Sequence, residues 1–111
     1  MGESQLVLRS RPMSHLSSLP VGLQLALRER RLLKVIAGLT NHDQAAVLRI
    51  SRAAAAGVAD LVDIACDPRL VAAVAQSCPG LPICVSAVDP ELFPAAVEAG
   101  ASLVEIGRAH V

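Results

Sequence analysis

The chain has 111 residues, 53% of them hydrophobic, with one Phe, no Trp and no Tyr, and its ten basic residues balance ten acidic ones. Zero net charge and the near absence of aromatic side chains argue against a nucleic-acid-binding surface based on net basicity or base stacking. Only 18% of the residues are charged, and no apolar run reaches the roughly 18 residues of a membrane span. We therefore expect a globular chain of at most one domain, neither disordered nor inserted in a membrane.

Residues 1–21 differ in composition from the rest of the chain. Ser, Arg and Pro are frequent there, Glu3 is the only acid, and no periodic apolar face is visible. This composition is typical of a targeting remnant such as an organelle transit peptide, but it equally suits a plain disordered extension. We keep both interpretations and expect the folded domain to occupy residues 22–107.

The pattern changes at Gly22 and then predicts one helix followed by alternating strands and helices. A short amphipathic helix precedes the first strand, and Asn41 is placed to cap the next helix. Asp-Pro pairs introduce the two later helices, because Asp is a good cap and Pro suits the first helical turn. The predicted strands are 34–39, 59–65, 82–88 and 102–106, and the helices between them are 43–56, 68–77 and 90–99.

An internal repeat indicates the architecture. Ala59–Ala65 matches Ala101–Gly107, and Asp67–Leu70 matches Asp89–Leu92. Repeating βα units of about twenty residues favour a TIM (β/α)₈ barrel over a doubly wound sheet, and no GxGxxG or Walker A loop is present. The predicted fold class is α/β, with parallel βα units that form the N-terminal half of a TIM barrel. Since such a barrel needs roughly 250 residues, we expect truncation after the fourth strand.

Two carboxyl side chains are predicted to face the interior of that barrel. By the two-residue alternation of a strand, Asp63, Ser86 and Glu105 point toward the barrel axis, and their neighbours point toward the helices. Asp63 and Glu105 suit a general acid and base, and Ser86 suits a hydroxyl that orients a ligand. The alternative is a structural network in which each carboxylate binds a cation or a backbone amide, and Lys34 is one such partner.

Further candidates lie where the strands end. Gly38 and Asn41, at the end of the first strand, are predicted to bind a ligand, whereas His42 is interpreted as an exposed loop residue. Cys66 precedes a helix N-terminus, which would lower its pKa and make it the best candidate for a reactive cysteine. The spacing of the three cysteines resembles no metal site, so we predict buried, reduced thiols, no metal, and a cofactor that stays unknown.

Four phrases, taken together and in order, resemble the hypothetical chloroplast reading frame twenty-three family of cyanobacteria and plastids. The resemblance covers about residues 24–107, and its most specific part is the Pro-Ile-Cys-Val-Ser-Ala-Val run. It implies an aldolase-type barrel located in a plastid or a photosynthetic cell, and it supplies no reaction. The phrases are Lys34–Asn41, Val62–Ala65 with Asp67-Pro68, Leu81–Phe93, and Ala99–Gly107.

The leading functional hypothesis is a barrel protein that binds or transforms a small anionic metabolite at the carboxyl ends of its strands. Whether it is an enzyme is left open, and the alternative is a non-catalytic ligand-sensing or assembly module. Four parallel strands have two open edges, so a homodimer formed through these edges is expected as a further option. No nucleic-acid or membrane partner is expected, and residues 108–111 are interpreted as a non-native tail.

Overall fold

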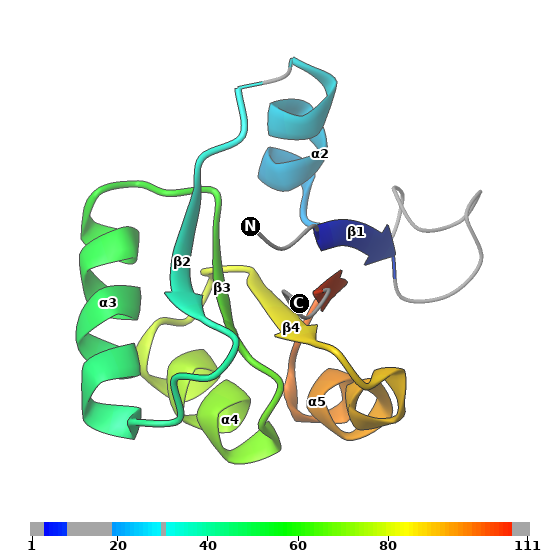
Figure 1. Cartoon of the computed structure of the whole chain (residues 1–111). Coiled ribbons are helices and arrows are strands. Elements are labelled where there is room, and N and C mark those ends of the chain that lie inside the picture. Colours follow the sequence, from blue (N-terminus) through cyan, green and yellow to red (C-terminus); the bar gives the residue numbers. More distant parts are fainter. Residues whose placement is uncertain (1–3, 9–18, 30, 108–111) are drawn as a thin grey trace.

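The computed structural model describes residues 4–8, 19–29 and 31–107 of the chain. A five-stranded sheet forms its centre, with the strand order β1-β5-β4-β3-β2 (Figure 1). The strands from β2 to β5 run parallel and follow one another without a reversal of order, as the sequence predicts. The strands are β1 (Ser4–Leu8), β2 (Lys34–Gly38), β3 (Leu61–Ala65), β4 (Ile83–Ala87) and β5 (Leu103–Gly107).

Helices connect the parallel strands, so the predicted alternation of βα units is confirmed. Helices α3, α4 and α5 pack side by side against one face of the sheet, and α2 lies near the end where the parallel strands begin (Figure 1). None of the helices in the described part of the chain is long and apolar enough to cross a membrane. The helices are α2 (Val21–Arg28), α3 (Gln44–Ala56), α4 (Pro68–Ser77) and α5 (Phe93–Ala99), and a 3₁₀ turn, η1 (Pro90–Leu92), precedes α5.

The two faces of the sheet carry different side chains. Val62 and Ile64 belong to the large core between the sheet and the helices α3, α4 and α5. Leu61, Cys84 and Leu103 point to the opposite face, where they pack against α2. The predicted assignment of faces is therefore confirmed, and it follows from the alternation of side chains along a strand.

Aspartates begin the helices that follow the strands. Asp67 accepts a hydrogen bond from the amide of Arg69 at 3.0 Å, and Asp89 accepts one from Glu91 at 3.0 Å. Each such cap contributes about 1 kcal/mol. The prediction that Asn41 caps α3 is wrong, because Asp43 holds that position and accepts from the amide of Ala46.

The helix predicted at 90–99 is divided into a 3₁₀ turn and a shorter α-helix. Pro94 has no backbone N–H, so it cannot donate the α-helical hydrogen bond to the carbonyl of Pro90. Instead the amide of Phe93 bonds Pro90 three residues back, which gives the tighter 3₁₀ geometry before α5 begins.

Strand β1 lies in the amino-terminal segment for which no strand is predicted. It runs antiparallel to β5, with Ser4 opposite Gly107 and Leu8 opposite Leu103. One edge of the parallel sheet is thus covered, and β2 forms the opposite edge of the described sheet. The rest of residues 1–18 and the predicted tail 108–111 lie outside the described residues.

Candidate functional site

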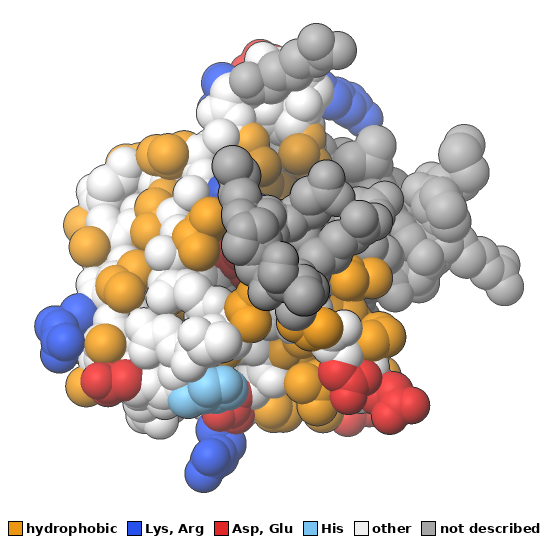
Figure 2. All heavy atoms as spheres, viewed as in Figure 1, with side chains coloured by type: hydrophobic (Ala, Val, Ile, Leu, Met, Phe, Trp, Pro, Cys, Tyr) orange, Lys and Arg blue, Asp and Glu red, His pale blue; other side chains and the backbone are white. Residues whose placement is uncertain are grey.

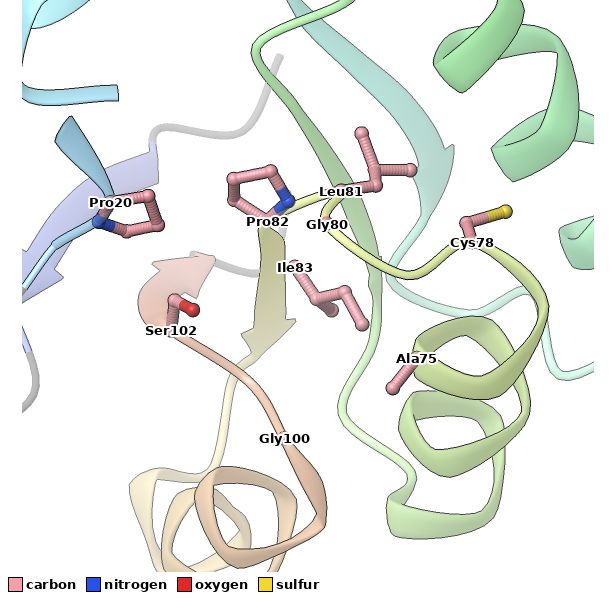
Figure 3. Close-up of a pocket in the computed structure, with 9 residues that line it drawn as sticks. All are labelled: Pro20, Ala75, Cys78, Gly80, Leu81, Pro82, Ile83, Gly100 and Ser102. Carbon is pink, nitrogen blue, oxygen red and sulfur yellow. The ribbon is translucent and has the colours of Figure 1, made fainter. Parts of the chain in front are cut away.

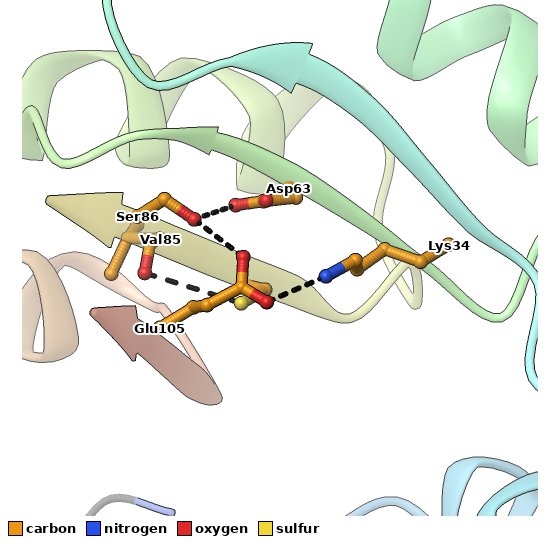
Figure 4. Close-up of polar contacts among 6 residues, drawn as sticks. Lys34, Asp63, Val85, Ser86 and Glu105 are labelled. Carbon is orange, nitrogen blue, oxygen red and sulfur yellow. Dashed lines mark hydrogen bonds and ion pairs between the residues drawn. The ribbon is translucent and has the colours of Figure 1, made fainter. Parts of the chain in front are cut away.

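Four polar side chains meet on the face of the sheet that is turned away from α3, α4 and α5 (Figure 4). Ser86 Oγ lies 2.6 Å from Asp63 Oδ1 and 3.0 Å from Glu105 Oε2. Lys34 Nζ donates to the other oxygen of Glu105 at 2.7 Å. We call these four residues the carboxyl network. The structure thus brings together the three predicted catalytic candidates and the predicted cationic partner.

The strand register explains how this network forms. Ser86 is paired with Glu105 across β4 and β5, and Asp63 is paired with Cys84, two residues before Ser86. Side chains two residues apart in a strand share one face, so the hydroxyl lies between the two carboxyls. Asp63, Ser86 and Glu105 are each no more than 5% exposed, so water contributes little to their solvation.

The hydroxyl of Ser86 has one proton but two carboxyl neighbours. It can donate to one of them, and the second contact is satisfied only if that carboxyl is protonated and donates to Oγ. Burial, together with the neighbouring Glu105, raises the pKa of Asp63 to about 6, and the Ser86 hydrogen bond and Lys34 oppose this rise. Below about pH 6 the shared proton therefore belongs on Asp63, and in that state the Asp63 carboxyl donates to Ser86 Oγ while the hydroxyl donates to Glu105.

Glu105 carries the negative charge of the network. Burial by itself would raise the pKa of Glu105, but the hydrogen bonds from Lys34, Asp63 and Ser86 outweigh burial and hold it below its ordinary value. Burial by itself would lower the pKa of Lys34. The hydrogen bond and the attraction to Glu105 outweigh burial, so the pKa of Lys34 is raised. With Asp63 protonated, the network holds one cation, one anion and two neutral groups, and the buried charges cancel.

A cavity of about 260 Å³ opens where the parallel strands end, beside this network. Ser86 belongs to both, so this residue links the network to the cavity. His42 lies in the rim, 59% exposed, with Nδ1 3.4 Å from Asp67 Oδ2. Apart from Asp89, the other lining residues are apolar, and they include Leu39, Cys66, Val88 and Leu92. Of the cavity's lining residues, only Ser86 and Cys66 were given a functional role from the sequence.

The predicted ligand-binding residues Gly38, which ends β2, and Asn41, in the loop that follows, do not line the cavity. The side chain of Asn41 donates to the carbonyl of Ala37 at 3.3 Å and accepts from the amide of Asp43 at 3.2 Å. Gly38 adopts a φ of +110°, which suits glycine, and its carbonyl accepts from the amide of Asn41. Both residues thus shape the loop that places Leu39 and His42 at the cavity.

Cys66 is not the reactive cysteine that the sequence suggests. It is 8% exposed, and burial together with the charge of Asp67 raises its pKa to about 11. Its Sγ donates to the carbonyl of Leu92 at 3.3 Å. The expected lowering of the Cys66 pKa by the helix N-terminus is wrong, because burial and the negative charge of the cap Asp67 both raise it. All three thiols are free and buried, as predicted.

A second cavity, of about 230 Å³, lies at the opposite end of the parallel strands (Figure 3). Pro20, Pro82 and Ser102 approach one another there, and Ala75 and Cys78 of the α4 region form another side. Its lining residues include no acid, Lys, Arg or His, and Cys78 is the one ionisable side chain among them, so this cavity is a poorer candidate for acid–base chemistry.

Together, these features define a class: an α/β protein of parallel βα units with a buried carboxyl network beside a cavity at the carboxyl ends of its strands. Among the residues that the structure describes, no group of three or more His, Cys, Asp or Glu side chains is placed to hold a metal ion.

Sequence comparison then identifies the family. Residues 17–110 match the family model described as "Protein of unknown function (DUF561)", and the chain belongs to this family. It is 49% identical over 82 residues to the "Uncharacterized protein ycf23" of Cyanophora paradoxa. Proteins of the same name from Antithamnion sp. and Cyanidium caldarium are 38% identical over 80 residues and 41% identical over 84 residues. The resemblance stated from the sequence phrases is therefore confirmed.

The matched segments cover 74%, 72% and 76% of this chain, but only 34%, 28% and 33% of the respective relatives. The chain thus spans about a third of the length of the curated relatives that it matches. No solved structure matches it.

Proposed function

We propose that this protein is the N-terminal half of a TIM-type barrel that binds a small anionic metabolite at the carboxyl ends of its strands. The observation that carries the proposal is the position of Ser86. Its hydroxyl contacts both buried carboxyls, and the same residue lines the cavity at the strand ends. In barrels of this type, ligands bind at that end.

The contact between Lys34 and Glu105 supports the barrel. These residues lie on β2 and β5, which are separated in the sheet by β3 and β4. A second close approach also supports the barrel. Leu39, which follows β2, lies so near Gly107 of β5 that a Cβ added at Gly107 would be 2.9 Å from the Leu39 side chain. These two approaches between the outermost parallel strands support a sheet that curls toward this face, as the strands of a barrel do.

The carboxyl network supports acid–base chemistry on the bound ligand. A ligand atom that takes the Ser86 proton leaves Oγ free to receive the proton of Asp63, so the proton moves along the chain and Asp63 becomes the anion. Because the pKa of Asp63 is about 6, that proton can be given and recovered near neutral pH. The anionic nature of the ligand rests on the architecture, because barrels frequently bind phosphate after their last two strands.

Ligand binding is testable with three probes: inorganic phosphate, glycerol 3-phosphate and malate. The full-length relative from Cyanophora paradoxa is screened first by thermal shift, and any probe that binds is then titrated into this chain and followed by NMR. We expect shifts at His42 and Val88 that Ser86→Ala abolishes. The matched control is Ser102→Ala at the opposite cavity, which should leave them unchanged. No response to any of the three probes, or equal loss in both variants, contradicts the proposal.

A non-catalytic ligand-sensing or assembly module is the second candidate function. One observation favours it: the four side chains of the carboxyl network satisfy one another without a ligand. Such a network stabilises the inner face of a sheet whether or not chemistry occurs there. The test uses a full-length relative that carries the substitutions equivalent to Asp63→Asn and Glu105→Gln. If the relative catalyses a reaction and each substitution abolishes it, this candidate is rejected.

A plastid location is also part of the proposal. It rests on the family resemblance and on the relatives named ycf23. Homodimerisation is proposed through the edge of β2 alone. In the described part of the chain β1 covers β5, so β2 is the accessible edge of the parallel strands.

A further inference from the structure

We propose that the groove between the outer edge of β2 and helix α3 is a docking surface for one more parallel βα unit. The occupant is supplied by the part of the family sequence that lies beyond the segment matched here. This inference rests on the barrel proposed above, and it identifies the partner of the barrel's first strand.

The groove is apolar and large enough for side chains. A cavity of about 270 Å³ lies between β2 and α3, and its lining contains no charged residue. Leu33 and Val35 border it on the strand side, and Ile50, Ala53 and Ala54 border it on the helix side. Apolar side chains gather over β2 and α3 on the face seen in Figure 2. Such a surface favours contact with another apolar surface over exposure to water.

The edge of β2 has little to keep another strand away. Within the described residues, β2 pairs with β3 on one side and with no strand on the other. Natural edge strands are commonly protected by a charged side chain, especially Lys. Lys34 is the only charged residue of β2, and its ammonium group is turned inward to Glu105. Ile36 is 62% exposed and Leu33 is 53% exposed.

The repeating packing of the described units defines the shape of the missing neighbour. Strand β3 pairs with β2 while α4 packs on α3, and β4 pairs with β3 while α5 follows α4. The β2–α3 unit is the first of this series and has a neighbour on one side only. At the other end β1 already lies along β5. A parallel strand with its own helix would continue the series at β2.

The family sequence has enough chain to supply this unit. The segment matched here covers 34% of the Cyanophora paradoxa relative, which leaves roughly two thirds of that protein unmatched; a βα unit here occupies about twenty residues. A second copy of this chain is a poorer occupant. A two-fold axis would set the two β2 strands antiparallel, unlike every pair of βα units in the structure.

The test is complementation in trans. This chain is co-expressed with the part of the Cyanophora paradoxa relative that lies outside its matched segment, and the complex is analysed by sedimentation and amide hydrogen exchange. We expect a one-to-one complex in which the amides of residues 34–38 exchange at least tenfold more slowly than in the chain alone. If the fragment is insoluble, the same exchange is measured in a chimera that carries this chain in place of the matched segment.

Two variants of α3 make the test specific. Ala53→Glu places a charge in the groove, and Ala45→Glu places the same charge on an exposed site of the same helix outside the groove. The first should weaken association at least tenfold and the second should not, with circular dichroism confirming that both variants fold. The inference is overturned by failure to associate, by a complex with unprotected β2, by equal effects of both variants, or by a dimer of this chain alone that protects β2. Since no ligand is involved, the outcome is independent of whether the cavity binds a metabolite.

Discussion

Lys34 Nζ lies 2.7 Å from Glu105 Oε1, although their strands are the two outermost of the four parallel strands. Neighbouring strands lie about 4.8 Å apart, so a flat sheet would separate these two backbones by roughly 14 Å. Side chains stand nearly perpendicular to a sheet, and two of them meet across such a gap only when the sheet is concave. The ion pair thus links the charge balance of the carboxyl network to the curvature of the sheet.

Lys34→Met should destabilise the protein by removing the cation that compensates the buried Glu105. We expect a loss of about 1–2 kcal/mol at pH 7, less than for a fully buried pair, because Lys34 keeps 23% of its side chain exposed. Urea unfolding measures this loss. The double variant Lys34→Met/Glu105→Gln should recover at least half of it, since no unpaired charge then remains. If Lys34→Met alone is as stable as the wild type, the ion pair does not have the proposed role.

Asp63→Asn should change how stability depends on pH. Because the pKa of Asp63 is about 6 in the folded protein and near 4 in an unfolded chain, its stabilising contribution is complete below about pH 4. That contribution is lost as the pH rises through 6. The asparagine amide would keep the donor to Ser86 without ionising, so the variant should gain on the order of 1–2 kcal/mol relative to the wild type between pH 5 and 7.5. Urea unfolding measures the free energy of unfolding of both proteins over this pH range. If the difference between wild type and variant stays constant, Asp63 does not carry the shared proton.

Local patterns predicted most of this fold because the strands are short, apolar and regularly spaced. The alternation along Leu61–Ala65 was enough to place Asp63 on the face opposite the helices, and the repeat then placed Glu105. The pairing of β1 with β5 could not be predicted, since it joins residues about a hundred positions apart. The helix cap was misassigned because Asn41 and Asp43 are both good caps, and only the path of the loop decides between them.

The residues of the carboxyl network were named from the sequence, but their arrangement was not predicted. Sequence alternation identifies which side chains face inward, but it does not show that Ser86 separates the two carboxyls or that Lys34 reaches across two strands. Those contacts depend on register and curvature, which arise only when the whole sheet is assembled. For the same reason, the raised pKa of Cys66 could not be read from its place before a helix.

The three cysteines should react slowly with a thiol reagent in the native protein. All are buried, and burial raises the pKa of Cys66 to about 11 and that of Cys84 still further. At pH 8 less than about 1% of Cys66 would be thiolate. Labelling with a chromogenic disulfide should therefore be at least a hundredfold slower than in urea. Rapid labelling of a single cysteine at pH 8, located by mass spectrometry, would restore the hypothesis of a reactive thiol.

Val58→Gly should stabilise the protein. Val58 follows α3 with a φ of +59°, a left-handed conformation that costs an L-residue roughly 1–2 kcal/mol, and a β-branched residue suits it especially poorly. Its side chain is 83% exposed, so little apolar burial is lost on substitution. Glycine makes the unfolded chain more flexible, which offsets part of the gain, and a net increase of about 0.5–1 kcal/mol is expected in urea unfolding. Ala56→Gly, two residues earlier in α3, is the matched control and should destabilise by about 0.5–1 kcal/mol. If both glycines lower stability alike, then the backbone at Val58 is not strained in solution.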